Sequence, residues 1–279
     1  MFIWLSSYPK SGNTFVRSLL SSYFFSEDGN FDFSMLKNIP QFPSAKLFEK
    51  LDINIKDEKE VVRNYLVAQK MINKKGVVQF LKTHSYLFDI ENNPFTSLDY
   101  SLGVIYIVRD PRNVVTSFSN HNQISNQKAL DIITNSHIYA TLKKDDIIVY
   151  SGTWASHFNS WKPFREKNIY LLIKYEDLIK DTEKALYSIL DFIYKLGKKN
   201  LIIDKKKFIN TINSTSFEKL QNLEEKNGFK ESITNEETGS KSKFFYKGPK
   251  NDWKKRLEPD LQKKIELIFQ KEMIELKYL

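Results

Sequence analysis

The stretch that decides the fold is residues 2–15, which read Phe2-Ile3-Trp4-Leu5-Ser6-Ser7-Tyr8-Pro9-Lys10-Ser11-Gly12-Asn13-Thr14-Phe15. The apolar run over Phe2–Ser6 predicts a short buried strand, and proline and glycine mark a loop after it. A helical pattern follows over Thr14–Phe25. A small-residue turn that enters a helix presents free backbone N–H groups, and the helix dipole adds partial positive charge. Because Lys10 adds a full charge, we expect this turn to bind an anion.

Strands and helices alternate along the rest of the chain. Apolar, β-branched runs at Val77–Leu81, Leu102–Val108 and Ile169–Ile173 predict three more strands. Helices are expected at Pro111–Phe118 with Asp110 as N-cap, Thr153–Phe164, Thr182–Leu196 and Asp260–Leu276. The alternation predicts an α/β fold with a central, mainly parallel sheet flanked by helices.

No composition break divides the chain, so we expect residues 1–279 to form a single domain. The stretches 26–60, 120–150 and 222–245 look irregular. In α/β folds ligands bind at the carboxyl ends of the strands, and such loops are natural covers for that edge.

The composition excludes several kinds of site. The 279 residues include no cysteine, which excludes disulfides, thiolate metal sites and a cysteine nucleophile. None of the four histidines has the spacing of a metal-binding motif, so no metal site is expected. No apolar run approaches the roughly 18 residues that span a bilayer, and no signal pattern opens the chain. These features predict a cytoplasmic protein without a transmembrane segment.

The formal net charge is +9, and most of the excess lies late in the chain. Residues 195–279 carry 20 Lys and Arg against 13 Asp and Glu. Such an excess is typical of a solvated lysine-rich surface, or of a protein that binds nucleic acid, an acidic membrane or a polyanionic small molecule. Composition alone leaves these alternatives open.

The anion-binding turn does not match the nucleotide P-loop pattern. That pattern places a glycine, four residues, and then Gly-Lys-Ser/Thr. Here Lys10 precedes Gly12, and no glycine stands four residues earlier. From these generic features, an ordinary capped turn between strand and helix is as good an interpretation as a phosphate site.

The segment Tyr8-Pro9-Lys10-Ser11-Gly12-Asn13-Thr14 resembles the 5′-phosphosulfate loop of the sulfotransferases, which use 3′-phosphoadenosine 5′-phosphosulfate (PAPS). The resemblance implies that Ser11, Gly12, Asn13 and Thr14 hold the 5′-phosphate. It also implies that Lys10 contacts the oxygen between phosphate and sulfate. Phe15 stands where the family often has a tryptophan against the adenine.

Two further segments follow the family in order. Ile105–Ser117 is similar to its 3′-phosphate segment, which implies Arg109 and Ser117 as phosphate ligands. An arginine at a strand end can bind a phosphate through two nitrogens. Lys82-Thr83-His84 resembles the family's Lys-Thr-His stretch, which implies His84 as the catalytic base, with Lys82 assisting Lys10. The remaining histidines, His121, His137 and His157, have no comparable context.

Later segments complete the resemblance. Tyr175, in a Tyr-Glu-Asp segment, is implied to lie near the adenine. Thr215 is implied to hydrogen bond the base, and Phe217 to pack on it. The stretch 246–254 resembles the segment that closes over the 3′-phosphate, which implies Lys247 and Gly248 as ligands.

Two residues depart from that last segment. Tyr246 replaces an arginine, which removes a phosphate ligand, and Asn251 replaces a glycine. The C-terminal dimer motif of many cytosolic members is not recognisable, so the sequence assigns no oligomeric state.

The resemblance implies a P-loop-like α/β fold and sulfuryl transfer from PAPS, with 3′,5′-bisphosphoadenosine (PAP) as product and no metal. The acceptor is expected to be a small molecule, glycan or lipid with a hydroxyl group, in preference to an amine; nucleic acid is not an expected partner. The alternatives are a P-loop-type nucleotide kinase or hydrolase, and a non-catalytic nucleotide- or polyanion-binding protein. Five loop aromatics either line an acceptor pocket or, more simply, pack their own loops: Phe31, Phe33, Phe42, Phe88 and Phe95.

Overall fold

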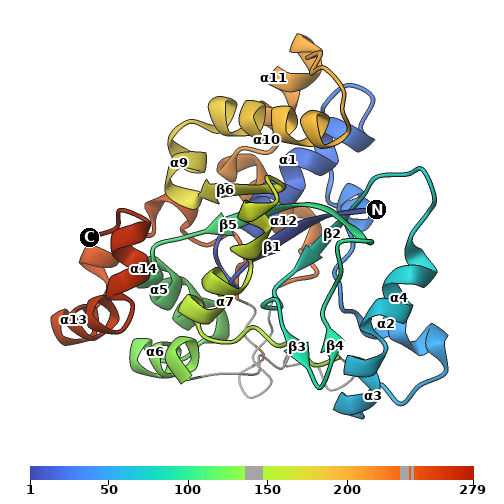
Figure 1. Cartoon of the computed structure of the whole chain (residues 1–279). Coiled ribbons are helices and arrows are strands. Elements are labelled where there is room, and N and C mark those ends of the chain that lie inside the picture. The colour runs from blue at the N-terminus through green and yellow to red at the C-terminus, as the bar shows by residue number, and fades with distance from the viewer. Residues whose placement is uncertain (136–146, 233–238, 240–241) are drawn as a thin grey trace.

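A four-stranded parallel sheet lies at the centre of the computed structural model, which describes residues 1–135, 147–232, 239 and 242–279 (Figure 1). The strand order is β2-β1-β5-β6, and each neighbouring pair is parallel. The strands are β1 (Phe2–Ser7), β2 (Gln79–Thr83), β5 (Ser101–Val108) and β6 (Tyr170–Lys174). A separate short hairpin pairs β3 (Asp89–Ile90) with β4 (Asn93–Pro94).

The register of β1 brings the ends of three strands together. Leu5 pairs with Lys82 on one side and with Ile105 on the other. All six residues of β1 are buried, as expected for a strand covered on both faces. The loops that leave β1, β2 and β5 therefore start at one edge of the sheet.

Helices cover both faces of the sheet (Figure 1). Alternate side chains of β1 enter different buried clusters, Ile3 and Leu5 one, Trp4 the other. The first cluster receives side chains from α1 (Asn13–Phe25), α9 (Tyr175–Lys180), α10 (Thr182–Leu196) and α11 (Lys205–Ser214). The second receives them from α3 (Glu58–Arg63), α4 (Tyr65–Ile72), α5 (Pro111–Asn122), α6 (Asn126–Asn135), α7 (Trp154–Ser160), α8 (Pro163–Glu166), α13 (Pro259–Ile268) and α14 (Gln270–Glu275).

The remaining elements are five short helical segments and the longer helix α12. They are η1 (Phe33–Asn38), α2 (Ala45–Phe48), η2 (Glu49–Leu51), α12 (Phe217–Asn227), η3 (Gly248–Lys250) and η4 (Trp253–Lys255). Within the described ranges, no helix has the length and apolar character needed to cross a bilayer.

The predicted strands and most predicted helices are confirmed, with corrections at their ends. The second strand begins at Gln79, two residues later than its apolar run. The helix expected over Thr153–Phe164 is interrupted at Trp161, and the one expected over Asp260–Leu276 is interrupted at Phe269. The side chains of Trp161 and Phe269 are buried in the core. Pro163, which has no backbone N–H to continue the helix, accompanies the first break.

The prediction that 26–60 and 120–150 are irregular was wrong in part. The first stretch contains η1, α2, η2 and the start of α3, and the second contains α6. Helix α6 buries Ala129, Leu130 and Ile133, a helical spacing that a polar composition obscures in the sequence.

Candidate active site

A cavity of about 990 Å³ lies beside the loops that follow β1, β2 and β5, and residues after β6, such as Tyr175, Phe217 and Lys247, also line it. Most residues singled out in the sequence line it: Lys10, Gly12, Asn13, Thr14, Phe15, Lys82, His84, Arg109, Ser117, Tyr175, Phe217, Lys247 and Gly248. Two predicted residues, Ser11 and Thr215, do not. The resemblance thus selected residues that the fold gathers around one cavity.

The loop from β1 to α1 makes a tight turn. Lys10 and Gly12 both have left-handed backbone angles, with φ of 66° and 100°. A Cβ atom at Gly12 would lie 2.5 Å from a ring carbon of Tyr175, so only glycine fits there. The Asn13 amide donates hydrogen bonds to the Leu5 carbonyl oxygen at 2.9 Å and to Ser7 Oγ at 3.2 Å, which fastens the turn to β1.

Arg109 clamps this turn from the end of β5. One guanidinium nitrogen donates to the Lys10 carbonyl oxygen at 3.0 Å, and the group lies 4.3 Å from the centre of the Tyr175 ring. Arg109 is 5% exposed, and its Nε has no partner among the residues described. A buried cation with an unused donor favours an anionic ligand.

His84 follows β2 and has a defined tautomer. Its Nδ1 lies 2.8 Å from the Ser7 carbonyl oxygen, which only accepts, so Nδ1 carries the hydrogen and Nε2 the lone pair. Burial, followed by the charge on Lys82, lowers the pKa of His84 to about 3. The ring is therefore neutral at physiological pH, and Nε2 can accept a proton.

Of the two lysines of the site, Lys82 is buried and Lys10 is half-buried. Burial, opposed by the charge on Glu231 and assisted by the charges on Arg109 and Lys82, lowers the pKa of Lys10 to about 7. Burial also lowers the pKa of Lys82, whose Nζ lies 3.2 Å from a carboxylate oxygen of Glu231. The Lys10 ammonium lies 4.2 Å from the centre of the Phe244 ring.

Arg17 and Glu231 were not predicted from the sequence. The Glu231 carboxylate accepts hydrogen bonds from Thr14 Oγ1 at 3.1 Å and Arg17 Nη1 at 2.6 Å. Arg17 lies three residues after Thr14, on the same face of α1, and this spacing could have indicated it. The sequence around Glu231 carries no comparable signal.

The far side of the cavity is aromatic. A Cβ at Gly248, whose φ is 47°, would lie 2.1 Å from the Phe217 ring, so the two residues are in close contact. Thr215 departs from the expectation. It is fully buried, and its hydroxyl donates to the Thr211 carbonyl oxygen at 2.7 Å, as a helical threonine often does. Ser11 is likewise buried, and its hydroxyl has no partner in the described part of the chain.

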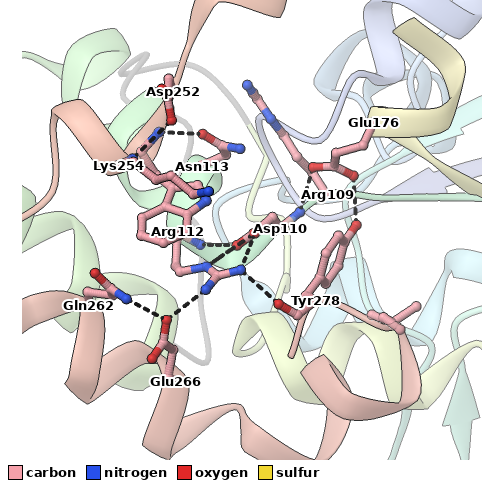
Figure 2. A network of polar contacts seen from close by, with 12 residues as sticks. Arg109, Asp110, Arg112, Asn113, Glu176, Asp252, Lys254, Gln262, Glu266 and Tyr278 are labelled. Atoms are coloured by element: carbon pink, nitrogen blue, oxygen red, sulfur yellow. Dashed lines mark hydrogen bonds and ion pairs between the residues drawn. The ribbon is translucent and has the colours of Figure 1, made fainter. Parts of the chain in front are cut away.

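Behind Arg109, a polar network fixes the turn from β5 to α5 (Figure 2). Arg112 pairs with Asp110 at 2.7 Å and with Glu266 at 2.7 Å, and donates to the Tyr278 carbonyl oxygen at 3.0 Å. Glu176 accepts from the Asp110 N–H at 3.1 Å. These contacts hold the strand end that carries Arg109.

Tyr246 and Asn251, the two residues that depart from the family pattern in the stretch 246–254, have different surroundings. The Asn251 amide donates to Thr116 Oγ1 at 2.9 Å, and its φ of −76° makes no demand for glycine. Tyr246 is 43% exposed at the rim. Asn251 therefore supplies a structural contact where the family has glycine.

The five loop aromatics pack into buried clusters and do not line the cavity. Phe42, Phe88 and Phe95 belong to the core cluster that contains Trp4, and Phe31 and Phe33 pack with Phe229 and Phe245. None of the five lines the cavity. Over the described ranges, no group of three or more His, Asp or Glu side chains is placed to hold a metal ion.

Comparisons with known proteins agree with this geometry. Residues 2–277 match the family model described as the sulfotransferase domain. Sulfotransferase 2A6 of mouse is 27% identical over 177 residues, which cover 61% of this chain and 56% of that protein. Sulfotransferase 2A2 of rat is 30% identical over 174 residues, with 61% and 56% covered. The match thus spans little more than half the length of these relatives.

Solved structures share the fold. The mouse sulfotransferase SULT7A1 complexed with PAP has a TM-score of 0.60 at 20% identity, covering 97% of this chain and 83% of that one. Retinol dehydratase in complex with androsterone and the inactive cofactor PAP has a TM-score of 0.63 at 18% identity, covering 98% and 80%. With the family model matching almost every residue, the chain belongs to the sulfotransferase family.

Proposed function

We propose that this chain transfers a sulfuryl group from PAPS to an acceptor hydroxyl. The observation that carries the proposal is the meeting, at one cavity, of the Nε2 lone pair of His84, the ammonium groups of Lys10 and Lys82, and the anion-binding turn at the start of α1. A base, two cations and an anion cradle are what sulfuryl transfer requires of a protein.

The residues present fit a nucleotide with phosphates at both ends. The Ser11 hydroxyl and Arg109 Nε are buried polar groups without partners among the described residues, and both belong to predicted phosphate ligands. Gly12 and Gly248 let the Tyr175 and Phe217 rings pack directly against the backbone of the two loops. The solved relatives named above contain PAP, which supports the same assignment.

Each end of the nucleotide has its own set of residues. In this proposal, Ser11, Gly12, Asn13 and Thr14 bind the 5′-phosphate. Arg109, Ser117, Lys247 and Gly248 bind the 3′-phosphate, and Phe15, Tyr175 and Phe217 surround the adenine. Thr215 joins them only if its hydroxyl leaves the Thr211 carbonyl oxygen.

PAPS, when bound, supplies the sulfuryl group and a phosphate leaving group. His84 Nε2 takes the acceptor's hydroxyl proton as the acceptor oxygen bonds to sulfur. Lys10 and Lys82 stabilise the electron pair left on the phosphate oxygen when its bond to sulfur breaks. The backbone hydrogen bond from His84 Nδ1 to Ser7 keeps Nε2 unprotonated and available before the reaction.

The same comparisons support a proposal for the chemical class of the acceptor. Retinol dehydratase has been solved with androsterone and, separately, with retinol, which supports a small apolar alcohol over a glycan. We also propose that residues 1–279 act as one domain, that the protein is cytoplasmic, and that no metal takes part.

The test is a transfer assay with PAPS and a panel of small alcohols, phenols and sterols, read by mass spectrometry for an added sulfuryl group. The expected result is transfer by the unaltered chain and loss of most transfer by His84→Ala, with PAP binding retained. Activity with ATP and Mg²⁺ but none with PAPS would favour a kinase or hydrolase. An active His84→Ala variant would remove His84 from the role of base.

A further inference from the structure

We propose that the Glu231 carboxylate takes the place of the donor's 5′-phosphosulfate group while the site holds no donor, and is exchanged for that group when the donor binds. The proposal rests on the donor site assigned above. Glu231 is neither the proposed base nor a proposed phosphate ligand. In this proposal its carboxylate competes with the donor's 5′-phosphosulfate group for the same hydrogen-bond donors, which lowers the affinity for the donor.

The contacts of Glu231 are those of a bound anion. One carboxylate oxygen accepts from both Thr14 Oγ1 at 3.1 Å and Lys82 Nζ at 3.2 Å, and the other accepts from Arg17 Nη1 at 2.6 Å. A carboxylate and a phosphate or sulfate oxygen make the same charge-assisted hydrogen bonds. Thr14 and Lys82 are also residues proposed to hold the 5′ end of the donor.

The cations around Glu231 need an anion when no donor is present. The side chains of Lys82 and Arg17 are 5% and 8% exposed, and leaving either buried charge unpaired is costly. The charge on Glu231 also raises the pKa of Lys82 and of Lys10 against the effect of burial. Glu231 therefore pairs with Lys82 and Arg17 and favours the protonated forms of Lys82 and Lys10.

The turn that carries Glu231 is packed in place. The Phe229 ring lies 4.6 Å from that of Phe33 and 4.9 Å from that of Phe244. Just beyond, the Ser232 hydroxyl donates to Glu224 at 2.6 Å. Contacts of Phe229 and Ser232 thus hold the backbone on both sides of Glu231, so its carboxylate extends to the cations from a fixed backbone position.

The exchange predicts selectivity between the two ends of the nucleotide. Thr14 Oγ1 has one hydrogen, which it cannot donate to Glu231 and to a 5′-phosphate at once. Two anions beside Lys82 Nζ would also repel each other, so a 5′-phosphate must displace the Glu231 carboxylate. The 3′-phosphate set, which includes Arg109 and Ser117, makes no hydrogen bond with Glu231 among the contacts of the described residues. Removing the charge of Glu231 should therefore strengthen binding of a 5′-phosphate alone.

The experiment compares adenosine 5′-monophosphate with adenosine 3′-monophosphate by titration calorimetry at about pH 6, where Lys10 is protonated. Glu231→Gln is expected to bind the 5′-monophosphate about tenfold or more tighter than the unaltered chain, the size of one charge-assisted hydrogen bond. Binding of the 3′-monophosphate is expected to change by less than about twofold.

The matched control is Glu275→Gln. Glu275 also lies between a lysine and an arginine, Lys162 and Arg165, and has a similar exposed fraction of 33% against 29% for Glu231, but it is not among the lining residues. It should leave both affinities unchanged. Unchanged or weaker 5′-monophosphate binding by Glu231→Gln, or no binding by either protein, overturns the proposal.

A second measurement does not depend on the variant folding. In a crystal structure of the unaltered chain with adenosine 5′-monophosphate, we expect the Glu231 carboxylate to have left Lys82 and Thr14; the present contacts persisting beside the phosphate would contradict the exchange. Neither measurement involves sulfuryl transfer. If the exchange is observed but no sulfuryl transfer from PAPS, the proposed function is wrong and this inference stands. If transfer is observed without the exchange, only this inference is wrong.

Discussion

His157 Nε2 donates a hydrogen bond to the backbone carbonyl oxygen of His84 at 3.2 Å. The direction follows because a carbonyl oxygen only accepts, so Nε2 carries the hydrogen, and His157 Nδ1 then accepts from the Tyr106 hydroxyl at 2.8 Å. Burial lowers the pKa of His157 to about 3, so the ring stays neutral. The contact fastens α7 to the residue after β2 and fixes the backbone of the proposed base.

The loss of this hydrogen bond should lower the rate of sulfuryl transfer without changing the affinity for the donor. His157→Ala is expected to lower kcat about 10- to 100-fold, because a small displacement of the base has such an effect. His157→Gln, whose amide can donate to the same oxygen, should recover much of the loss. The measurement is steady-state kinetics together with PAP titration. A loss confined to PAP affinity, or an unchanged kcat, would show that His157 does not position His84.

The low pKa of Lys10 predicts how donor binding depends on pH. Burial holds this pKa at about 7, so the ammonium is fully protonated only below that pH. A bound phosphate favours the protonated form and raises the pKa. Affinity for PAP should therefore fall as pH rises above 7, by up to about tenfold per pH unit.

The measurement is PAP titration between about pH 7 and pH 9, above the second ionisation of the phosphates at about 6. Lys10→Arg, which stays charged throughout, should flatten the profile. His84 and His121, whose pKa values are about 3, do not titrate in this range. A flat profile for the unaltered chain would remove Lys10 as the titrating ligand.

Gly12→Ala tests the close approach of the turn to Tyr175. The new Cβ would lie 2.5 Å from the ring, and φ is +100°. Gly76 offers a matched control, because its φ is +75° and a Cβ there meets nothing within 4 Å. Gly12→Ala should lower the free energy of unfolding by about 2 kcal/mol more than Gly76→Ala, as measured in urea. Equal losses would mean that only the backbone angle matters.

Arg112→Met tests the network behind Arg109. It leaves the buried Asp110 carboxylate without its ion-pair partner, so we expect a loss of about 3–5 kcal/mol in the free energy of unfolding. Arg165→Met is the control, because the Arg165 side chain, which pairs with Glu275, is 40% exposed. Its loss should lower the free energy of unfolding by less than about 1 kcal/mol. A similar small loss at both positions contradicts a structural role for the network.

Local pattern was enough to predict the sheet, and the family resemblance selected residues of which most line one cavity. The buried run at Phe2–Ser6 and the turn after it were readable because a strand buried on both faces is continuously apolar. Motif order then identified Arg109 and His84, which the parallel register brings to the same cavity. The N-cap Asp110 was also predicted, and its carboxylate accepts from the Arg112 N–H at 2.9 Å.

What the sequence did not indicate depends on contacts between distant segments. Glu231 lies more than 200 residues from Thr14, and no local pattern connects them. His157 gains its place from Tyr106 and the His84 carbonyl oxygen, both supplied by other elements. The break at Phe269 has no local signal, whereas Pro163, which lacks a backbone N–H, could have indicated the break at Trp161.

The central claim is that the cavity at the start of α1 is a donor site for a phosphosulfate nucleotide. The most direct measurement is the stability of the unaltered chain with increasing PAP, because it requires no knowledge of the acceptor. At about 100 times its dissociation constant, PAP should add about 2.7 kcal/mol to the free energy of unfolding. A folded chain whose unfolding is unmoved by saturating PAP would contradict the donor site and the transfer function together.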